Sequence, residues 1–103
     1  MTVKTDYATY KNCSLELGKY RTGELAIQIW NHEEGPIATL TVCLPFGGNL
    51  KENESYVDIN NCPWAGKFIE QYELGEFTGR YGFSGYCTYP LYEFNMDKLQ
   101  KEV

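Results

Sequence analysis

The residues of this sequence best suited to chemistry are four cysteines, Cys13, Cys43, Cys62 and Cys87. No two of them lie within four residues of each other, so the paired spacing of a zinc site or a redox motif is absent. We therefore interpret the cysteines as small hydrophobic residues of the core. Cys62 differs because it lies at the start of a predicted helix, where the positive end of the helix dipole can lower a thiol pKa.

Other residue types that support catalysis or ligand binding are poorly placed for it. His32, the one histidine, lies in a predicted turn beside Glu33 and Glu34 and resembles no local catalytic signature. None of the carboxylates lies in an apolar setting that would raise its pKa for acid catalysis, and none forms a calcium-loop pattern. Gly47-Gly48 is not followed by the Lys-Ser/Thr of a phosphate-binding loop. We expect no catalytic residue, no cofactor and no metal.

Composition indicates one folded domain, residues 1–103, with 43% hydrophobic and 22% charged residues. The net charge of −5 argues against a general binder of nucleic acid or of anionic membranes. All of that net charge lies between Glu52 and Glu76, where six acidic residues accompany one basic residue, Lys67. No stretch is long and apolar enough to cross a membrane, and the first residues lack the apolar core of a signal peptide. We therefore expect a cytoplasmic protein.

Aromatic residues gather between Phe77 and Phe94, directly after the acidic segment. The sequence GRYGFSGY at 79–86 is similar to the RNA-recognition signature, in which rings on a strand stack on bases. Its basic residue and glycine are transposed, however, and Ser84 takes the aliphatic position. We instead predict a hairpin whose rings complete the core. Some tyrosines should stay exposed, with Arg80, as a protein-binding surface.

Alternating apolar residues predict antiparallel strands in the first half of the chain. The three strands are expected at Cys13–Leu17, Leu25–Ile29 and Ile37–Leu44. Turn-forming residues at 21–23 and 31–36 separate them. Connections this short favour an antiparallel meander over parallel crossovers.

A helix is predicted from Pro63 to Leu74, because aromatic residues recur every four positions along one of its faces. Asn60 or Asn61 is expected to cap it. Gly75 is expected to adopt the left-handed conformation just past its end.

The remaining segments complete the prediction. They are a polar loop that starts at 45–49, a short strand at Tyr56–Ile59, a hairpin turning near Ser84-Gly85, a last strand at Leu91–Phe94 and a helical turn within Asn95–Val103. The predicted fold class is α+β, an antiparallel β-sheet (a meander plus a C-terminal hairpin) with one helix packed on a face.

Three stretches of the chain together resemble a family of small domains of unknown function carried on bacterial conjugative elements and phages. They are GELAIQI at 23–29, ATLTVCLP at 38–45, and the segment from Thr78 to Phe94. The family pattern has Asn where this chain has Cys43, which weakens any special role for that thiol. The resemblance implies expression inside a bacterial cell from a mobile element. It transfers no catalytic residue, since the family has no assigned activity.

We expect a small, acidic, non-enzymatic protein-binding domain. In the setting that the resemblance implies, its most concrete function is inhibition of a host defence nuclease (anti-CRISPR or anti-restriction). An acidic surface would compete with nucleic acid for the Lys and Arg of the nuclease. The candidate partner-binding residues are Glu70, Glu73, Glu76, Arg80, Tyr81, Tyr86 and Tyr89. The alternative is an accessory or self-associating interaction module of a mobile element, with no inhibitory role.

Overall fold

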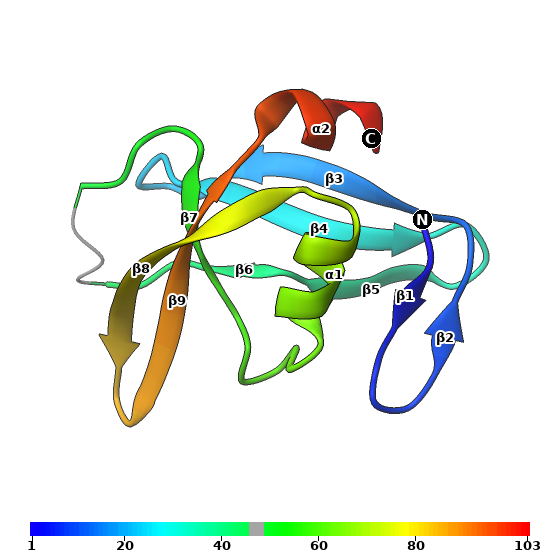
Figure 1. Ribbon diagram of the computed structural model, residues 1–103, viewed down its shortest axis with the longest axis horizontal. Helices are drawn as coiled ribbons and strands as arrows, with labels where there is room; N and C mark the ends of the chain where they lie inside the picture. Colours follow the sequence, from blue (N-terminus) through cyan, green and yellow to red (C-terminus); the bar gives the residue numbers. More distant parts are fainter. Residues whose placement is uncertain (46–48) are drawn as a thin grey trace.

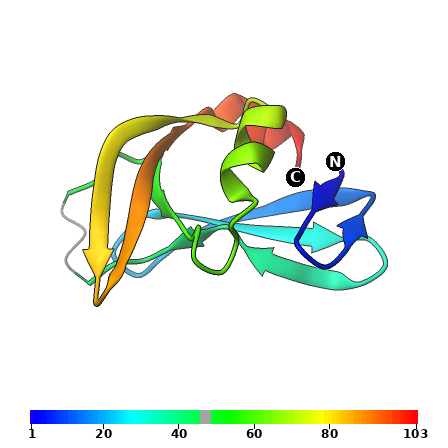
Figure 2. The ribbon, with the colours of Figure 1, turned by 60° about the horizontal axis from the view of Figure 1, so that its bottom comes forward.

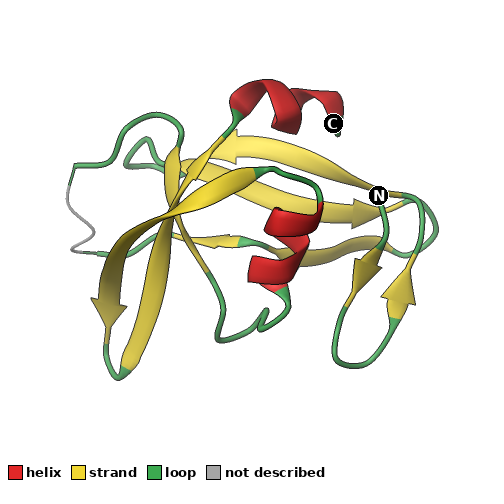
Figure 3. Ribbon diagram, viewed as in Figure 1, coloured by secondary structure: helices red, strands yellow, loops and turns green. Residues whose placement is uncertain are grey.

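The computed structural model describes residues 1–45 and 49–103 and consists mostly of antiparallel β-sheets with two short helices (Figures 1 and 3). The chain begins with a two-stranded hairpin, β1 (Val3–Lys4) and β2 (Thr9–Tyr10). A three-stranded sheet follows, formed by β3 (Cys13–Lys19), β4 (Leu25–Asn31) and β5 (Gly35–Thr39).

The second half of the chain builds a four-stranded sheet with the order β6-β7-β9-β8. Its strands are β6 (Thr41–Val42), β7 (Glu54–Val57), β8 (Gly75–Ser84) and β9 (Cys87–Phe94). Helix α1 (Ala65–Gln71) connects β7 to β8, and helix α2 (Met96–Lys101) follows β9. The meander and the hairpin, expected in one sheet, thus belong to two different sheets.

The alternating pattern of the first two strands is confirmed. Leu15 on β3 and Leu25, Ile27 and Ile29 on β4 are all buried, and the strands pair in antiparallel register. The turn between them has Gly23 at a φ of 97°, a conformation that glycine adopts without steric cost.

The strand predicted from Ile37 to Leu44 is interrupted at Leu40, where the chain passes from one sheet to the other. The Leu40 N–H donates to the Ile27 carbonyl (2.9 Å), while the Leu40 carbonyl accepts from the Asp58 N–H (2.9 Å). Leu40 therefore joins β4 to the segment after β7. The loop predicted to follow lies partly outside the described residues, since these exclude 46–48.

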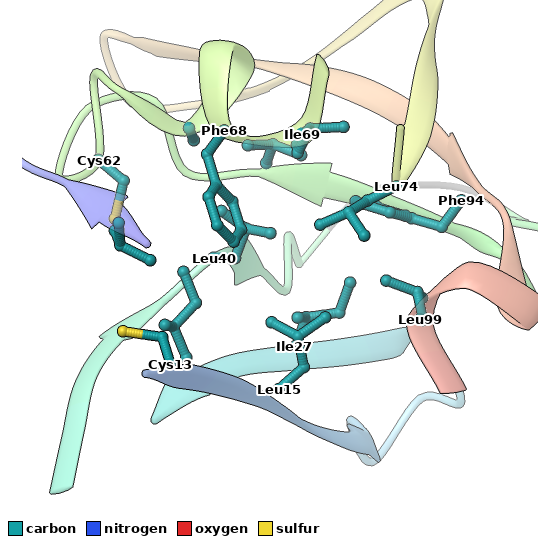
Figure 4. Close-up of a cluster of buried hydrophobic side chains, with 14 of the residues drawn as sticks. Cys13, Leu15, Ile27, Leu40, Cys62, Phe68, Ile69, Leu74, Phe94 and Leu99 are labelled. Carbon is teal, nitrogen blue, oxygen red and sulfur yellow. The ribbon is translucent and has the colours of Figure 1, made fainter. Parts of the chain in front are cut away.

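Two hydrophobic clusters form the interior. The larger combines residues of β3, β4, β7, α1, β9 and α2, with Phe68, Ile27, Leu74, Phe94 and Leu99 at its centre (Figure 4). The smaller consists of Leu44, Tyr56 and Leu91, and the first two of these side chains lie close to Gly82 of β8. At about 25 cal/mol per Å² of apolar surface, burial of this kind is the main stabilising term of a small domain.

Helix α1 is shorter than predicted, and its caps differ from the prediction. It begins after Trp64, which makes no side-chain capping bond, so neither Asn60 nor Asn61 caps it. The left-handed position past its end is Glu73, with a φ of 54°, and not Gly75. Neither helix among the described residues is long and apolar enough to span a membrane.

Gly75 is required for a different reason, the close approach of two strands. It is the first residue of β8, and a Cβ at this position would lie 2.7 Å from the Glu93 carbonyl oxygen.

The short strand before the helix is also displaced, since β7 begins at Glu54 and not at Tyr56.

The C-terminal hairpin turns where it was predicted. Ser84 pairs with Cys87 around a two-residue turn, and Gly85 has a φ of 60°. A register shift between Phe77 and Tyr81 bends β8. Figure 2 shows the hairpin arching away from the β3–β4–β5 sheet.

Candidate functional site

An open groove of about 1080 Å³ lies where α1, the start of β8, the end of β9 and α2 converge. In Figure 1 the start of β8 lies between α2 above and α1 below. The wall of the groove carries five carboxylates and a single lysine, Lys98. We call this hollow the acidic groove, after its five carboxylates: Glu70, Glu73, Glu76, Glu93 and Asp97.

The three acidic residues singled out from the sequence lie together in this groove. Glu70 lies on α1, Glu73 lies just after that helix, and Glu76 is the second residue of β8. Two further carboxylates, Glu93 and Asp97, were not among the candidates. Strand pairing brings Glu93 to the site, because its Cα is the register partner of Glu76.

The charge in the groove is only partly compensated. The Lys98 ammonium lies 3.6 Å from the Glu73 carboxylate, and the Lys51 ammonium lies 3.9 Å from that of Glu93. Both pairs are solvent-exposed, and exposed pairs of this kind contribute little to stability. Glu76 and Glu93 oppose each other directly on neighbouring strands, an arrangement that is destabilising for like charges.

A row of aromatic rings leads from the core to the groove. We call it the aromatic ladder: Phe94, Tyr92, Phe77 and Tyr81. The centroids of successive rings are 6.1, 5.8 and 5.2 Å apart, within the range of favourable ring pairs. Phe94 is 2% exposed, whereas Phe77 and Tyr81 are 43% and 53% exposed. Phe77 and Tyr92 also line the groove.

The phenol of Tyr92 links the ladder to the acidic groove. Burial raises its pKa above the ordinary value, and the nearby charge of Glu70 and the phenol of Tyr81 raise this pKa further. The Tyr92 side chain thus lies near the Glu70 carboxylate of α1, and its ring centroid is 5.8 Å from that of Phe77 on β8. Acidic and aromatic groups meet at one place on the surface.

Arg80 has a different role, because it forms an ion pair with a buried residue. Its Nη2 atom donates to Glu54 Oε2 at 2.9 Å, and the Glu54 side chain is 3% exposed. Glu54 is one of the six acidic residues of the segment Glu52–Glu76, so that segment presents less than its full charge to solvent.

The last two candidate residues are separate from the groove. Tyr86 is fully exposed at the hairpin turn. Tyr89 is half-buried and packs against the smaller hydrophobic cluster. Of the seven candidates, the structure therefore brings together Glu70, Glu73 and Glu76, places Tyr81 beside them through Phe77, and places Arg80, Tyr86 and Tyr89 elsewhere.

Cys62 does not have the lowered pKa expected of a helix N-terminus. The helix begins three residues later, and burial together with the nearby Asp58 carboxylate raises the thiol pKa to about 11. Cys13 and Cys62 are buried as predicted, Cys87 is half-buried, and Cys43 is exposed, which corrects its assignment to the core.

Within residues 1–45 and 49–103, no group of three His, Cys, Asp or Glu side chains is arranged to hold a metal ion. His32 is exposed in the turn between β4 and β5, where the buried Asn31 side chain accepts hydrogen bonds from the Glu33 and Glu34 N–H groups. The turn prediction for this segment is confirmed.

A family model, described as a domain of unknown function (DUF4313), matches residues 14–103. The chain belongs to this family. The match includes the whole acidic groove and the whole aromatic ladder, and leaves out residues 1–13, which contain the N-terminal hairpin and the first residue of β3. No curated protein and no solved structure matches the chain.

Proposed function

We propose that this protein is a non-enzymatic protein-binding domain whose acidic groove receives a basic surface of its partner. The observation that carries the proposal is the convergence of five carboxylates and one lysine on a single groove beside exposed aromatic rings. Carboxylates provide the long-range field that steers a basic partner toward the groove. Aromatic rings provide the apolar contact area in which binding energy concentrates.

The repulsion between groove carboxylates supports the same proposal. Glu76 and Glu93 face each other across β8 and β9, and the exposed Lys51 pairs with Glu93. Cations of a bound partner would relieve this repulsion. Binding would therefore gain both from new attractive pairs and from the removal of an unfavourable one.

The specific form of the proposal is an inhibitor of a host defence nuclease, anti-CRISPR or anti-restriction, made in the bacterial cytoplasm from a phage or conjugative element. Such nucleases bind phosphates with Lys and Arg, and phosphate contacts supply much of their affinity. A row of carboxylates presented by a folded domain competes for the same side chains. Inhibition should therefore weaken as ionic strength rises.

The test is co-purification of the tagged full chain from its host, followed by nuclease assays with the proteins recovered. The variant carries Glu70→Lys, Glu73→Lys and Glu76→Lys. A matched control carries Glu16→Lys, Glu33→Lys and Glu34→Lys, three exposed carboxylates outside the groove. We expect the groove variant to lose the partner and the control to keep it. Equal recovery with both variants would contradict the proposal.

The alternative, a self-associating or accessory module, is favoured by one observation. β8 is one of the two edge strands of its sheet among the described residues, and Tyr81 and Phe83 on it are exposed. An unpaired edge with aromatic side chains is a template for pairing with a second copy. Sedimentation of the wild type and of Phe83→Lys separates the two functions. A homodimer that Phe83→Lys dissociates, with no effect on defended cells, would favour the accessory role.

A further inference from the structure

The exposed end of the aromatic ladder is held in position by the core. Phe94 is buried, Tyr92 packs against it, and Phe77 contacts both Tyr92 and Tyr81. Each ring is therefore fixed by the one before it. The Phe77–Tyr81 pair has an interplanar angle of 63°, so the two rings form an edge-to-face corner. A ring pair that is already ordered loses little side-chain entropy when a ligand binds.

This corner lies against the acidic groove. Phe77 lines the groove together with Glu70 and Glu73, and Tyr92, whose ring centroid lies 5.8 Å from that of Phe77, lines it too. The negative faces of aromatic rings attract cations, and a carboxylate nearby strengthens this attraction. A neutral apolar side chain would gain only the ring contact. A cationic side chain gains the ring contact and the charge.

We propose that Phe77, Tyr81 and Glu70 form a binding site for one arginine side chain of the basic partner. This inference rests on the proposed function and identifies the group that the groove recognises. A guanidinium is planar, stacks on ring faces and is more weakly hydrated than an ammonium. It can place one face on a ring and donate to the Glu70 carboxylate at the same time. Lysine offers a point charge without the stacking surface, so arginine is the preferred residue.

The test measures the affinity of the full chain for three short Gly/Ser peptides that differ only in repeated arginine, lysine or citrulline residues. Citrulline keeps the planar shape of arginine but carries no charge. We expect arginine to bind about fivefold more tightly than lysine, a difference of about 1 kcal/mol, because the planar guanidinium stacks on the rings and the ammonium does not. Citrulline should not bind measurably.

The protein variants are Phe77→Leu with Tyr81→Leu, Tyr81→Leu alone, and Glu70→Gln. Phe83→Leu is the control, because Phe83 is an exposed ring of the same strand outside the ladder. Thermal unfolding establishes that each variant is folded. The Tyr81→Leu variant, whose side chain is half exposed, keeps the test valid should the double variant not fold. We expect the ladder variants to remove the preference for arginine over lysine and the control to keep it.

The outcomes separate this inference from the proposed function. Equal binding of the arginine and lysine peptides, weakened only by Glu70→Gln, would overturn the arginine site and leave the acidic groove supported. No binding of either cationic peptide would overturn both. Equal binding of the citrulline and arginine peptides would show a neutral site and overturn the arginine site.

Discussion

Arg80 and Glu54 form an ion pair that joins the edge strand β8 to β7 across the intervening strand β9. Their Nη2 and Oε2 atoms are 2.9 Å apart, and the Glu54 side chain is 3% exposed whereas that of Arg80 is 64% exposed. Glu54 Oε1 also accepts from the Lys51 N–H at 2.9 Å. Each oxygen of the buried carboxylate thus accepts a hydrogen bond, and the pair connects the bulged part of β8 to β7.

Removing the cation of this pair should destabilise the protein. In Arg80→Met the aliphatic stem is retained, but Glu54 stays buried with one partner fewer, and the loss is about 1–3 kcal/mol of unfolding free energy. Urea unfolding measures it. The double variant, Arg80→Met with Glu54→Gln, should lose less unfolding free energy than the two single variants added together, because the two side chains interact. Strictly additive effects of the two substitutions would show that the pair contributes nothing.

Among the four thiols of the native protein, we expect Cys62 to be the least reactive and Cys43 the most reactive. The raised pKa, about 11, leaves almost no thiolate at neutral pH, and the side chain is 4% exposed. Timed alkylation with mass spectrometry gives the order of reaction. Native-state labelling of Cys62 at the rate of Cys43 would contradict the structure.

The same thiol makes stability depend on pH. Its pKa is raised from 9.0 in the unfolded chain to about 11 in the fold, so between these values the folded state holds a proton that the unfolded state has released. The contribution of this thiol to the free energy of unfolding is therefore fully present below pH 9 and is lost as the pH rises toward 11. Comparison with Cys62→Ala isolates this contribution from the tyrosines. A wild type and variant with identical pH profiles in this window would refute it.

The link between Tyr92 and Glu70 can be tested by titration. Burial is the first cause of the raised Tyr92 pKa, and the Glu70 charge is the second. In Glu70→Gln the Tyr92 pKa should fall toward its ordinary value, while Glu34→Gln, an exposed control in a distant turn, should leave it unchanged. NMR of tyrosine labelled at Cζ resolves the residue. An unaltered Tyr92 pKa in Glu70→Gln would show that the Glu70 charge does not act on the Tyr92 phenol.

Two glycines provide a matched pair for the packing of the hairpin. A Cβ at Gly75 would meet the Glu93 carbonyl at 2.7 Å, whereas Gly18 on β3 has open space around it. Gly75→Ala should cost about 1–3 kcal/mol, since backbone atoms must move. Gly18→Ala should be neutral or stabilise by up to about 1 kcal/mol. Chemical denaturation of both variants tests the difference, and equal stabilities would contradict the close approach of β8 and β9.

The first-half strands were predictable because their pattern is local. The alternation of Leu25, Ile27 and Ile29 directly reflects one buried face, and the turn glycine at 23 fixes the hairpin. The break at Leu40 was not predictable, because it depends on hydrogen bonds to Ile27 and Asp58, which are distant in the sequence.

The acidic groove was only half predictable for the same physical reason. Counting back from the Ser84–Cys87 pair of an ideal hairpin places Glu76 opposite Asn95. The register shift between Phe77 and Tyr81 instead brings Glu76 opposite Glu93. Without knowledge of that bulge, no pattern in the sequence assigns Glu93 to the site or directs Arg80 to Glu54.

The acidic groove can be tested most directly as the binding surface by mapping where a cationic ligand binds. Titration of the ¹⁵N-labelled protein with an arginine-containing Gly/Ser peptide, followed by amide chemical shifts, reports each residue separately. We expect shifts concentrated at residues 70–77 and 92–98, which vanish at high salt, and none in the turn around His32 to Glu34. Shifts spread evenly over all exposed carboxylates, or confined to that turn, would contradict the assignment of the groove as the binding surface.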